Sequence, residues 1–368
     1  MNGLVILTPS YNKKQMVENM KIHLPVFFII IVFTCCTVNK SYENAELFLQ
    51  KNIPEAIFLN GQVVEFDQMI MAPRYMTIVD TVLLLTNSGS SNFINCYDIK
   101  NNKKIVESIS RGNGPEEMIS ARRVQVNDTF AWIFDKQKRK IHQYEKNDIC
   151  HSSRPALLKS IQIADFMDEI LVLPNEKILG LSLDPNRKRF CFYDMGGNLI
   201  SEVGEFPTFN LPLTPYEQAE AFIGDLVYFE DKILYSCENS DLIEIYDIDG
   251  NMIKRIHGPN GFYPKVKQFD AGQEKIGVGY QKDARDAYFS PVIYKDEIWI
   301  LYSGKSESES GSNYYLKDNI IVFDWKGKPI RQYKLEPPIM TFTIDEKNKN
   351  IYALSDDPEY HIIKFDVK

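Results

Sequence analysis

The sequence predicts an all-β protein, a six-bladed β-propeller, and three observations support this fold class. One short pattern recurs six times: an apolar residue, an aromatic residue three places later, and an acid directly after it. The aromatic positions are spaced by 47, 49, 53, 77 and 42 residues, and a period near fifty is typical of a blade of four antiparallel strands. The intervening segments are short β-branched and aromatic runs without a helical period. The six copies are Ile94/Tyr97-Asp98, Ile141/Tyr144-Glu145, Phe190/Tyr193-Asp194, Ile243/Tyr246-Asp247, Ile320/Phe323-Asp324 and Ile362/Phe365-Asp366.

Each blade is expected to contain an inner strand A, two middle strands B and C, and an outer strand D. The aromatic-acid pair ends strand C, and a hairpin leads from it into strand D. The sixth blade has no strand D after Asp366, whereas residues 57–66 supply an extra strand before the first blade. Pairing these two completes the last blade and removes an exposed sheet edge. The six blades are expected at residues 74–110, 121–163, 169–203, 222–256, 287–335 and 340–368.

The C-D hairpins have a sequence signature of their own. Asp194, Asp247 and Asp324 are each followed three places later by glycine. Glycine supplies the positive φ of a short hairpin, and aspartate accepts hydrogen bonds from the turn's own amides. The run Asp247-Ile-Asp249-Gly250-Asn251 resembles part of a calcium loop, but a third acidic position and the distal Glu are missing. A structural turn is therefore favoured there, and the aromatic residues are expected to pack between blades.

The N-terminus predicts export. Residues 24–33 form a continuous apolar run after Lys21, shorter than the roughly 20 residues of a membrane-spanning helix and similar to the core of a secretory signal. Cys35 and Cys36 follow at once and are the candidate lipidation sites of a bacterial lipoprotein, although the bulky Phe33 departs from the usual small residue. Plain secretion or a retained anchor is the alternative.

We therefore divide the chain into three parts. Residues 1–36 form a signal peptide whose true start is Met20 or Met1, residues 37–52 a short tether, and residues 53–368 the propeller. A lipid chain tethers a protein without spanning the bilayer. The expected location is the cell envelope, at the outer membrane, facing either the periplasm or the cell surface.

Composition excludes several functions. The 368 residues carry 42 basic and 50 acidic side chains, a net charge of −8, which argues against nucleic acid as a partner. The five histidines show no metal-binding spacing, so no metal and no cofactor is expected. Export would permit disulfides, but Cys96, Cys150, Cys191 and Cys237 are interpreted as buried free thiols. Three of the four lie in apolar strand segments of different repeats and are expected to be too far apart to bond.

Two long connections interrupt the period, residues 206–221 and 258–290, together with the Ser- and Glu-rich segment 303–313. In a propeller the D-A and B-C loops project from one face, so we expect the functional site there and at the mouth of the central channel. Aromatic faces and an arginine fork in these loops suit a sugar or a peptide, with simple loop packing as the alternative. The candidates are Tyr216, Tyr263, Tyr280, Arg285 and Tyr288.

The connection after the first blade, residues 111–117, is a further candidate. Its sequence is RGNGPEE, and Arg111, Asn113, Glu116 and Glu117 are the candidate ligand-binding residues. No strand-loop-helix context supports a phosphate site, and a structural turn is the alternative interpretation.

The pattern Gly112-x-Gly114-Pro115-x-Glu117 after such a blade resembles the TolB-like six-bladed β-propeller lipoproteins of Bacteroidetes, which are related to NHL-repeat propellers. The resemblance covers residues 40–368. It implies an envelope-anchored propeller and carries over no catalytic residue.

The favoured function is a binding or scaffold module that acts through the elaborated loop face, with a glycan, a peptide or an envelope protein as ligand and a monomeric chain. No local signature of a catalytic triad or metalloenzyme occurs. A hydrolase or lyase with a metal-assisted site at the central channel is the alternative, and it rests on fold analogy alone.

Overall fold

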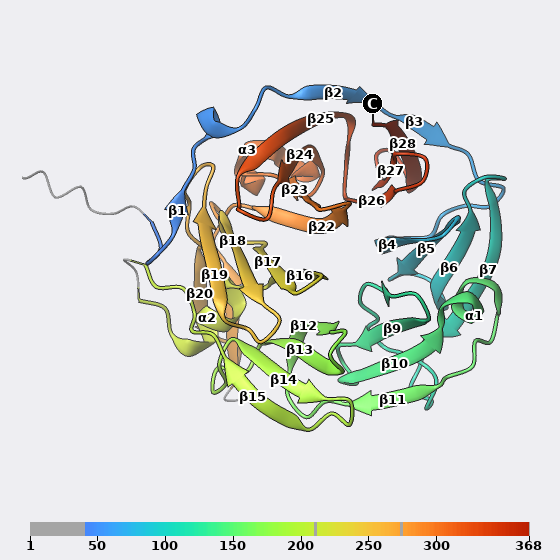
Figure 1. Ribbon diagram of the computed structural model, residues 1–368, viewed down its shortest axis with the longest axis horizontal. Coiled ribbons are helices and arrows are strands. Elements are labelled where there is room, and N and C mark those ends of the chain that lie inside the picture. Colours follow the sequence, from blue (N-terminus) through green and yellow to red (C-terminus); the bar gives the residue numbers. More distant parts are fainter. Residues whose placement is uncertain (1–40, 210–211, 273–274, 368) are drawn as a thin grey trace, which may run out of the picture. The chain divides into compact units, whose positions relative to one another are not determined.

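The computed structural model describes residues 41–209, 212–272 and 275–367. They form six sheets of mainly antiparallel strands, arranged as blades around a central axis (Figure 1). The predicted six-bladed all-β fold is therefore confirmed. The α-helices of the described chain are three short ones, α1 (Lys146–His151), α2 (Pro215–Ala221) and α3 (Glu307–Ser310), with 3-10 turns at Gln50–Asn52 and Gly311–Asn313.

The first three blades each hold four strands in sequence order, from the channel outward. Blade one contains β4 (Pro73–Val79), β5 (Val82–Asn87), β6 (Asn92–Asp98) and β7 (Lys103–Ser110). Blade two contains β8 (Gln125–Val126), β9 (Phe130–Asp135), β10 (Lys140–Glu145) and β11 (Lys159–Gln162). Blade three contains β12 (Met167–Val172), β13 (Lys177–Ser182), β14 (Phe190–Asp194) and β15 (Leu199–Val203).

The last three blades each gain a strand from the N-terminal segment. Blade four contains β16 (Gly224–Phe229), β17 (Lys232–Cys237), β18 (Leu242–Asp247) and β19 (Met252–His257). Blade five contains β22 (Tyr288–Tyr294), β23 (Glu297–Tyr302), β24 (Lys317–Phe323) and β25 (Pro329–Ile339). Blade six contains β26 (Thr341–Asp345), β27 (Asn350–Ser355) and β28 (His361–Asp366). The connection between blades four and five carries a hairpin, β20 (Val266–Asp270) and β21 (Ile276–Tyr280).

The recurring aromatic residues lie in the contacts between blades, as predicted. All six are at most 3% exposed, and each belongs to a different hydrophobic cluster. Each cluster joins two neighbouring blades, and burial of one such ring contributes roughly 2–3 kcal/mol. The core is thus divided into six interfaces, one between each pair of blades.

The C-D hairpins have the predicted turn chemistry. Asp247 Oδ1 accepts hydrogen bonds from the amides of Asp249 at 3.0 Å and Asn251 at 2.8 Å. Gly250 has a φ of +86°, a left-handed conformation that favours glycine. Asp194 and Asp324 make equivalent bonds in blades three and five. These contacts support the turn interpretation over the calcium loop.

One C-D connection is larger than expected. A hairpin is expected between strands C and D of each blade, but residues 146–158 of blade two contain helix α1. Ile149 and Cys150 on this helix are buried against blade one, which explains why the hairpin signature is missing there. The prediction is wrong for this blade.

The N-terminal segment runs along the outer edge of the last three blades (Figure 1). β1 (Glu46–Leu47) pairs in parallel with β19, and β2 (Ile57–Asn60) pairs in parallel with β25. β3 (Gln62–Val64) pairs antiparallel with β28 and is the fourth strand of blade six. We refer to residues 41–64 as the N-terminal belt.

The belt corrects the expected tether at residues 37–52. From Ser41 onward this segment is packed on the propeller, because Tyr42 is 2% and Phe48 7% exposed. Tyr42 joins the core between blades three and four, and its hydroxyl lies 2.6 Å from Ser240 Oγ. The signal peptide, Met20 and the candidate lipidation sites Cys35 and Cys36 lie outside the described residues. Within the described chain, no helix is long and apolar enough to cross a bilayer.

Candidate functional site

The central channel is a cavity of about 610 Å³ lined by the inner strands. Its middle is apolar, with Val124, Ile170 and Leu226 among the lining residues. Each inner strand starts on the face of the D-A and B-C loops and ends at an A-B turn, so the channel has two distinct ends. Asp128, Glu230 and Glu346 lie at the A-B end.

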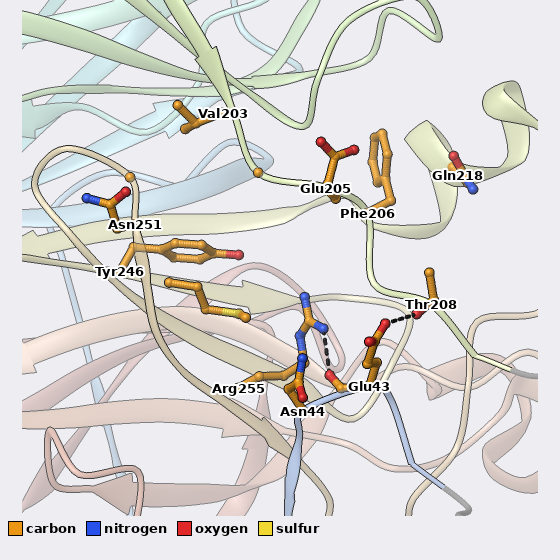
Figure 2. Close-up of a pocket in the computed structure, with 13 residues that line it drawn as sticks. Glu43, Asn44, Val203, Glu205, Phe206, Thr208, Gln218, Tyr246, Asn251 and Arg255 are labelled. Atoms are coloured by element: carbon orange, nitrogen blue, oxygen red, sulfur yellow. Dashed lines mark hydrogen bonds between the residues drawn. The ribbon is translucent and has the colours of Figure 1, made fainter.

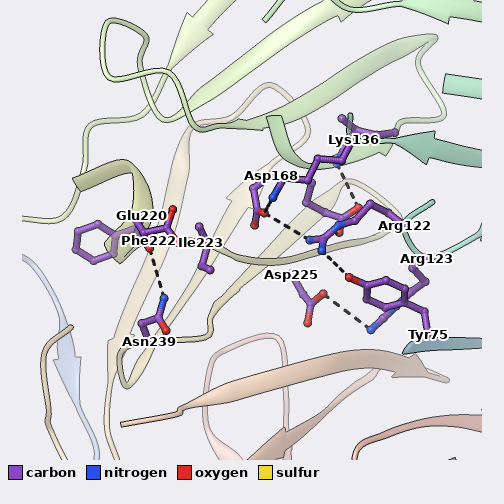
Figure 3. A network of polar contacts seen from close by, with 12 residues as sticks. Tyr75, Arg122, Arg123, Lys136, Asp168, Glu220, Phe222, Ile223, Asp225 and Asn239 are labelled. Atoms are coloured by element: carbon purple, nitrogen blue, oxygen red, sulfur yellow. Dashed lines mark hydrogen bonds and ion pairs between the residues drawn. The ribbon is translucent and has the colours of Figure 1, made fainter. Parts of the chain in front are cut away.

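The D-A end, which we call the channel mouth, is filled by charged residues from several blades. Arg122 precedes β8 and donates from Nη1 to the hydroxyl of Tyr75 on β4. Its Nη2 lies 3.1 Å from Glu169 Oε2 and 3.6 Å from Asp168 Oδ1, both on β12. Lys136 Nζ also donates to Asp168 Oδ1 at 2.7 Å. Arg122 therefore links blades one, two and three, as Figure 3 shows.

Arg123 reaches across the channel mouth. Its Nη2 lies 3.9 Å from Asp225 Oδ1 on β16, and its Nη1 donates to the Pro291 carbonyl on β22 at 3.3 Å. Asp225 Oδ2 accepts a hydrogen bond from the Ser290 amide at 2.8 Å. Adjacent arginines thus connect the inner strands of five blades.

Glu238 is the least satisfied carboxyl group of the mouth. It follows β17 at the same end of blade four as Asp225 and is half-buried. Among the described residues, its side chain has neither a hydrogen bond nor an ion pair. Burial, together with the negative charges of Asp225 and Asp168, raises the pKa of Glu238 to about 8. Burial likewise raises the pKa of Glu169 to about 6, although Arg122 opposes the shift.

Several polar atoms of the mouth are buried without a partner in the described chain. They are Asp168 Oδ2, Arg122 Nε and Arg123 Nε. A buried polar atom without a partner costs about 1–3 kcal/mol, and buried groups with perturbed pKa values are concentrated at functional sites. The mouth therefore holds one acceptor and two donors that the described chain does not satisfy.

The enlarged loops lie next to the mouth on the blade-four side. Tyr280, at the end of β21, donates to Glu220 Oε1 at 2.9 Å and accepts from Asn239 Nδ2 at 3.2 Å. Tyr280 is 45% exposed, and Tyr216 on α2 is 44% exposed. Figure 3 places Glu220 and Asn239 on the far side of Asp225 from Arg122. Two predicted aromatic candidates are therefore available to a ligand.

Two other candidates of these loops, Tyr263 and Arg285, are more enclosed. Tyr263 stacks on Phe209 with ring centroids 4.8 Å apart. Arg285 donates to the Gly304 carbonyl at 2.6 Å and pairs with Glu309, which gives it a role in holding the B-C loop of blade five.

The prediction that Tyr288 binds a ligand is wrong. Its side chain is 0% exposed and its hydroxyl donates to the Gly258 carbonyl. The ring packs against Tyr302 and Phe323. Side chains alternate between the two faces of strand β22, and Tyr288 points into the core between blades four and five.

The loop of residues 111–117 is separate from this group, between blades one and two. Arg111 donates to the carbonyls of Ser88, Ser90 and Ile119, which occupies its guanidinium. Glu117 Oε2 accepts from the Gly114 amide at 2.8 Å. These bonds support the structural-turn interpretation, whereas Asn113 and Glu116 remain exposed.

A second cavity, of about 740 Å³, lies at the rim between blades three and four (Figure 2). Glu43 of the belt, Phe206 and Arg255 are among its lining residues. Arg255 Nη1 donates to the Glu43 carbonyl at 2.8 Å, and Thr208 Oγ1 donates to Glu43 Oε2 at 3.0 Å. The belt therefore forms one wall of this cavity.

Sequence reasoning missed the residues of the channel mouth. Arg122 and Arg123 form a basic run of only two residues, and the acids lie about fifty residues apart at the starts of inner strands. These residues could have been found from their position in the strands. A charged residue at the start of an otherwise apolar inner strand faces the channel or the core. No group of His, Cys, Asp and Glu in the described chain has the geometry of a metal site.

Comparison with known proteins agrees with this fold. The family model described as TolB-like 6-blade propeller-like matches residues 53–347. No curated protein matches the sequence.

Solved structures show the same fold at low identity. One is a Bacteroides fragilis protein that is thought to be exported, with 12% identity and a TM-score of 0.55 over 88% of this chain and 98% of that one. Another belongs to the DUF4221 family from Bacteroides vulgatus, with 9% identity and a TM-score of 0.53 over 85% and 97%. Raptor from Chaetomium thermophilum shows 12% identity and a TM-score of 0.50, over 84% of this chain but 29% of that one.

Proposed function

Because the chain belongs to the TolB-like six-bladed propeller family, we propose that it is a binding module of the cell envelope that holds a small hydroxyl-rich ligand at the channel mouth. The observation that carries the proposal is Glu238, whose side chain has no partner among the described residues and lies within reach of the charges of Asp168 and Arg122. Asp168 Oδ2, Arg122 Nε and Arg123 Nε are buried without a partner in the described chain. A stable ring does not need these three atoms unsatisfied, since each costs free energy.

The chemistry of the mouth favours a saccharide. Unpaired carboxyl oxygens need donors, and unpaired guanidinium N–H groups need acceptors. A sugar hydroxyl is both at once, and the exposed rings of Tyr280 and Tyr216 offer apolar faces for its C–H groups. The candidate residues are therefore Glu238, Asp168, Arg122, Arg123 and Tyr280.

The location in the envelope is supported by the N-terminal sequence. The apolar run at residues 24–33 and the following Cys35 and Cys36 suit a lipoprotein signal. Mass spectrometry of the protein purified from its membrane fraction tests this. An acylated N-terminal cysteine at position 35 or 36 is expected, and a mature chain that starts elsewhere without lipid contradicts it.

A glycan array followed by calorimetry on the full-length chain tests the ligand. A saccharide that binds the parent protein is expected to bind the Glu238→Gln variant with at least tenfold lower affinity. The matched control is Glu230→Gln, the same change at the exposed A-B end of the same channel, and it should bind as the parent does. Binding that neither variant affects, or capture of peptides alone, contradicts the proposal.

A hydrolase or lyase at the channel is the second candidate, and the raised pKa of Glu238 is the observation that favours it. A carboxyl group protonated near neutral pH is able to donate a proton to a leaving group. Release of reducing ends from a bound saccharide, lost in Glu238→Gln, would establish this activity. A bound saccharide recovered intact after prolonged incubation excludes it.

A further inference from the structure

Two cysteines from different blades lie against each other in the core. Cys96 is on β6 of blade one, and Cys150 is on helix α1 of blade two. Cys96 Sγ lies 3.5 Å from the carbonyl oxygen of Ile149, the residue before Cys150. Both residues belong to the hydrophobic cluster between blades one and two. All four described cysteines are free and buried, as expected, but these two lie closer together than their different repeats suggested.

The other two described cysteines have different neighbours. Cys191 Sγ lies 4.0 Å from the Lys188 carbonyl, and Cys237 Sγ lies 3.6 Å from the Ala221 carbonyl. They belong to the clusters between blades two and three and between blades three and four. Among the described thiols, Cys96 and Cys150 are the two that share one hydrophobic cluster.

Either thiol is able to begin the reaction. The thiolate is the attacking species in disulfide exchange, and all four described cysteines are free thiols.

We propose that Cys96 and Cys150 form a disulfide that ties blade one to helix α1 when the chain folds in an oxidising compartment. The compartment, though not the bond itself, rests on the proposed export. The oxidant is a disulfide, either of a thiol oxidoreductase or of glutathione. The thiolate of one cysteine attacks one of its sulfurs and expels a thiolate. The other cysteine, once deprotonated, attacks the Sγ of the first and expels the second thiolate, so two cysteine thiols are oxidised as one disulfide is reduced to two thiols.

Burial dictates when this happens. Cys96 is 0% and Cys150 1% exposed, so an external disulfide does not reach them in the folded ring. The bond forms during folding, before α1 docks, and is then protected from reduction. Because α1 has six residues and lacks a side-chain N-cap bond, the covalent link fixes an element that is marginal alone.

Refolding the full-length protein in a glutathione redox buffer tests the proposal. After trapping with N-ethylmaleimide and non-reducing digestion, mass spectrometry should find the peptides of Cys96 and Cys150 joined, with Cys191 and Cys237 alkylated. Oxidised protein should melt about 5 °C above reduced protein. That difference should vanish in Cys96→Ser/Cys150→Ser and persist in the matched control Cys191→Ser/Cys237→Ser.

Alkylation of both Cys96 and Cys150 in the folded, oxidised protein would overturn the inference. So would random pairing of the four cysteines. Either result leaves the envelope location untouched, because the refolding buffer supplies the oxidant whether or not the chain is exported.

Discussion

The buried ion network below the rim cavity gives a quantitative test of the packing between blades three and four. Glu244 is 0% exposed and lies between two arginines. Its Oε2 pairs with Arg189, and its Oε1 accepts from Arg255 Nε at 2.6 Å. Tyr246 donates to the same carboxylate at 2.7 Å. Arg189 is itself 0% exposed, with its guanidinium 4.0 Å from the ring centroid of Tyr235.

Replacing Glu244 by Gln keeps the shape and removes the charge. The buried guanidinium groups of Arg189 and Arg255 then lose the carboxylate that they share. The new amide N–H₂ group also faces another hydrogen-bond donor. Breaking a buried ion pair from one side costs about 3–5 kcal/mol, a large part of the roughly 5–15 kcal/mol that stabilises a domain. Urea unfolding with linear extrapolation measures this loss.

The matched control is Glu46→Gln in the same blade. Glu46 pairs with Lys254 at 2.8 Å, but its side chain is 71% exposed, so the loss should stay below about 1 kcal/mol. A third variant, Arg189→Met/Glu244→Leu/Arg255→Met, replaces all three charges by apolar groups and should be near the parent in stability. Equal small losses for Glu244→Gln and Glu46→Gln would refute the reasoning.

Three further predictions follow from other parts of the structure. Tyr42→Ala should lower the free energy of unfolding by about 3–5 kcal/mol, because it empties a buried ring site, and urea unfolding against the exposed Leu49→Ala would show it. Melting temperature should fall as pH rises through about 8, since the pKa of Glu238 is raised above its usual 4.5 and the folded state holds that proton more tightly; Glu238→Gln should flatten the profile measured by calorimetry from pH 5 to 9. Gly327→Ala should cost more than Gly261→Ala in calorimetry, by about 1–3 kcal/mol, because both have positive φ but only at Gly327 would a Cβ meet a described atom, 2.1 Å from Ile256 Cδ1.

The sequence was sufficient to predict the blades because the repeating signal is local. Each aromatic-acid pair lies at or directly after the end of a strand C, from Asp98 in β6 to Asp366 in β28. The turn chemistry comes from residues within a few positions of each other. Such local patterns are recognisable in the sequence without information about the neighbouring blade.

The channel mouth and the belt strands β1 and β2 were not predictable in the same way, whereas a strand that completes blade six was expected within residues 57–66. Arg122, Glu169 and Asp225 meet only because three separate blades converge on one axis, and nothing in their flanking residues records that convergence. The belt strands are two to four residues long, too short to show alternation. Their partners lie some two to three hundred residues away along the chain.

The Cys96–Cys150 contact was missed for a related reason. Helix α1 occupies a position where the period predicts a plain hairpin, and its buried face was not visible as a departure from that period. Cys150 therefore lay outside any expected strand.

The belt also has a consequence for how the chain reaches its final form. A ribosome releases the partners of β1, β2 and β3 in the order β19, β25 and β28, so the earliest segment waits for the last. Long-range pairings of this kind are slow to form and leave strand edges open meanwhile. Synthesis from the N-terminus is therefore unable to finish the ring blade by blade. A C-terminal truncation that removes β28 should leave β3 unpaired and the sixth blade incomplete, however well the other five have formed.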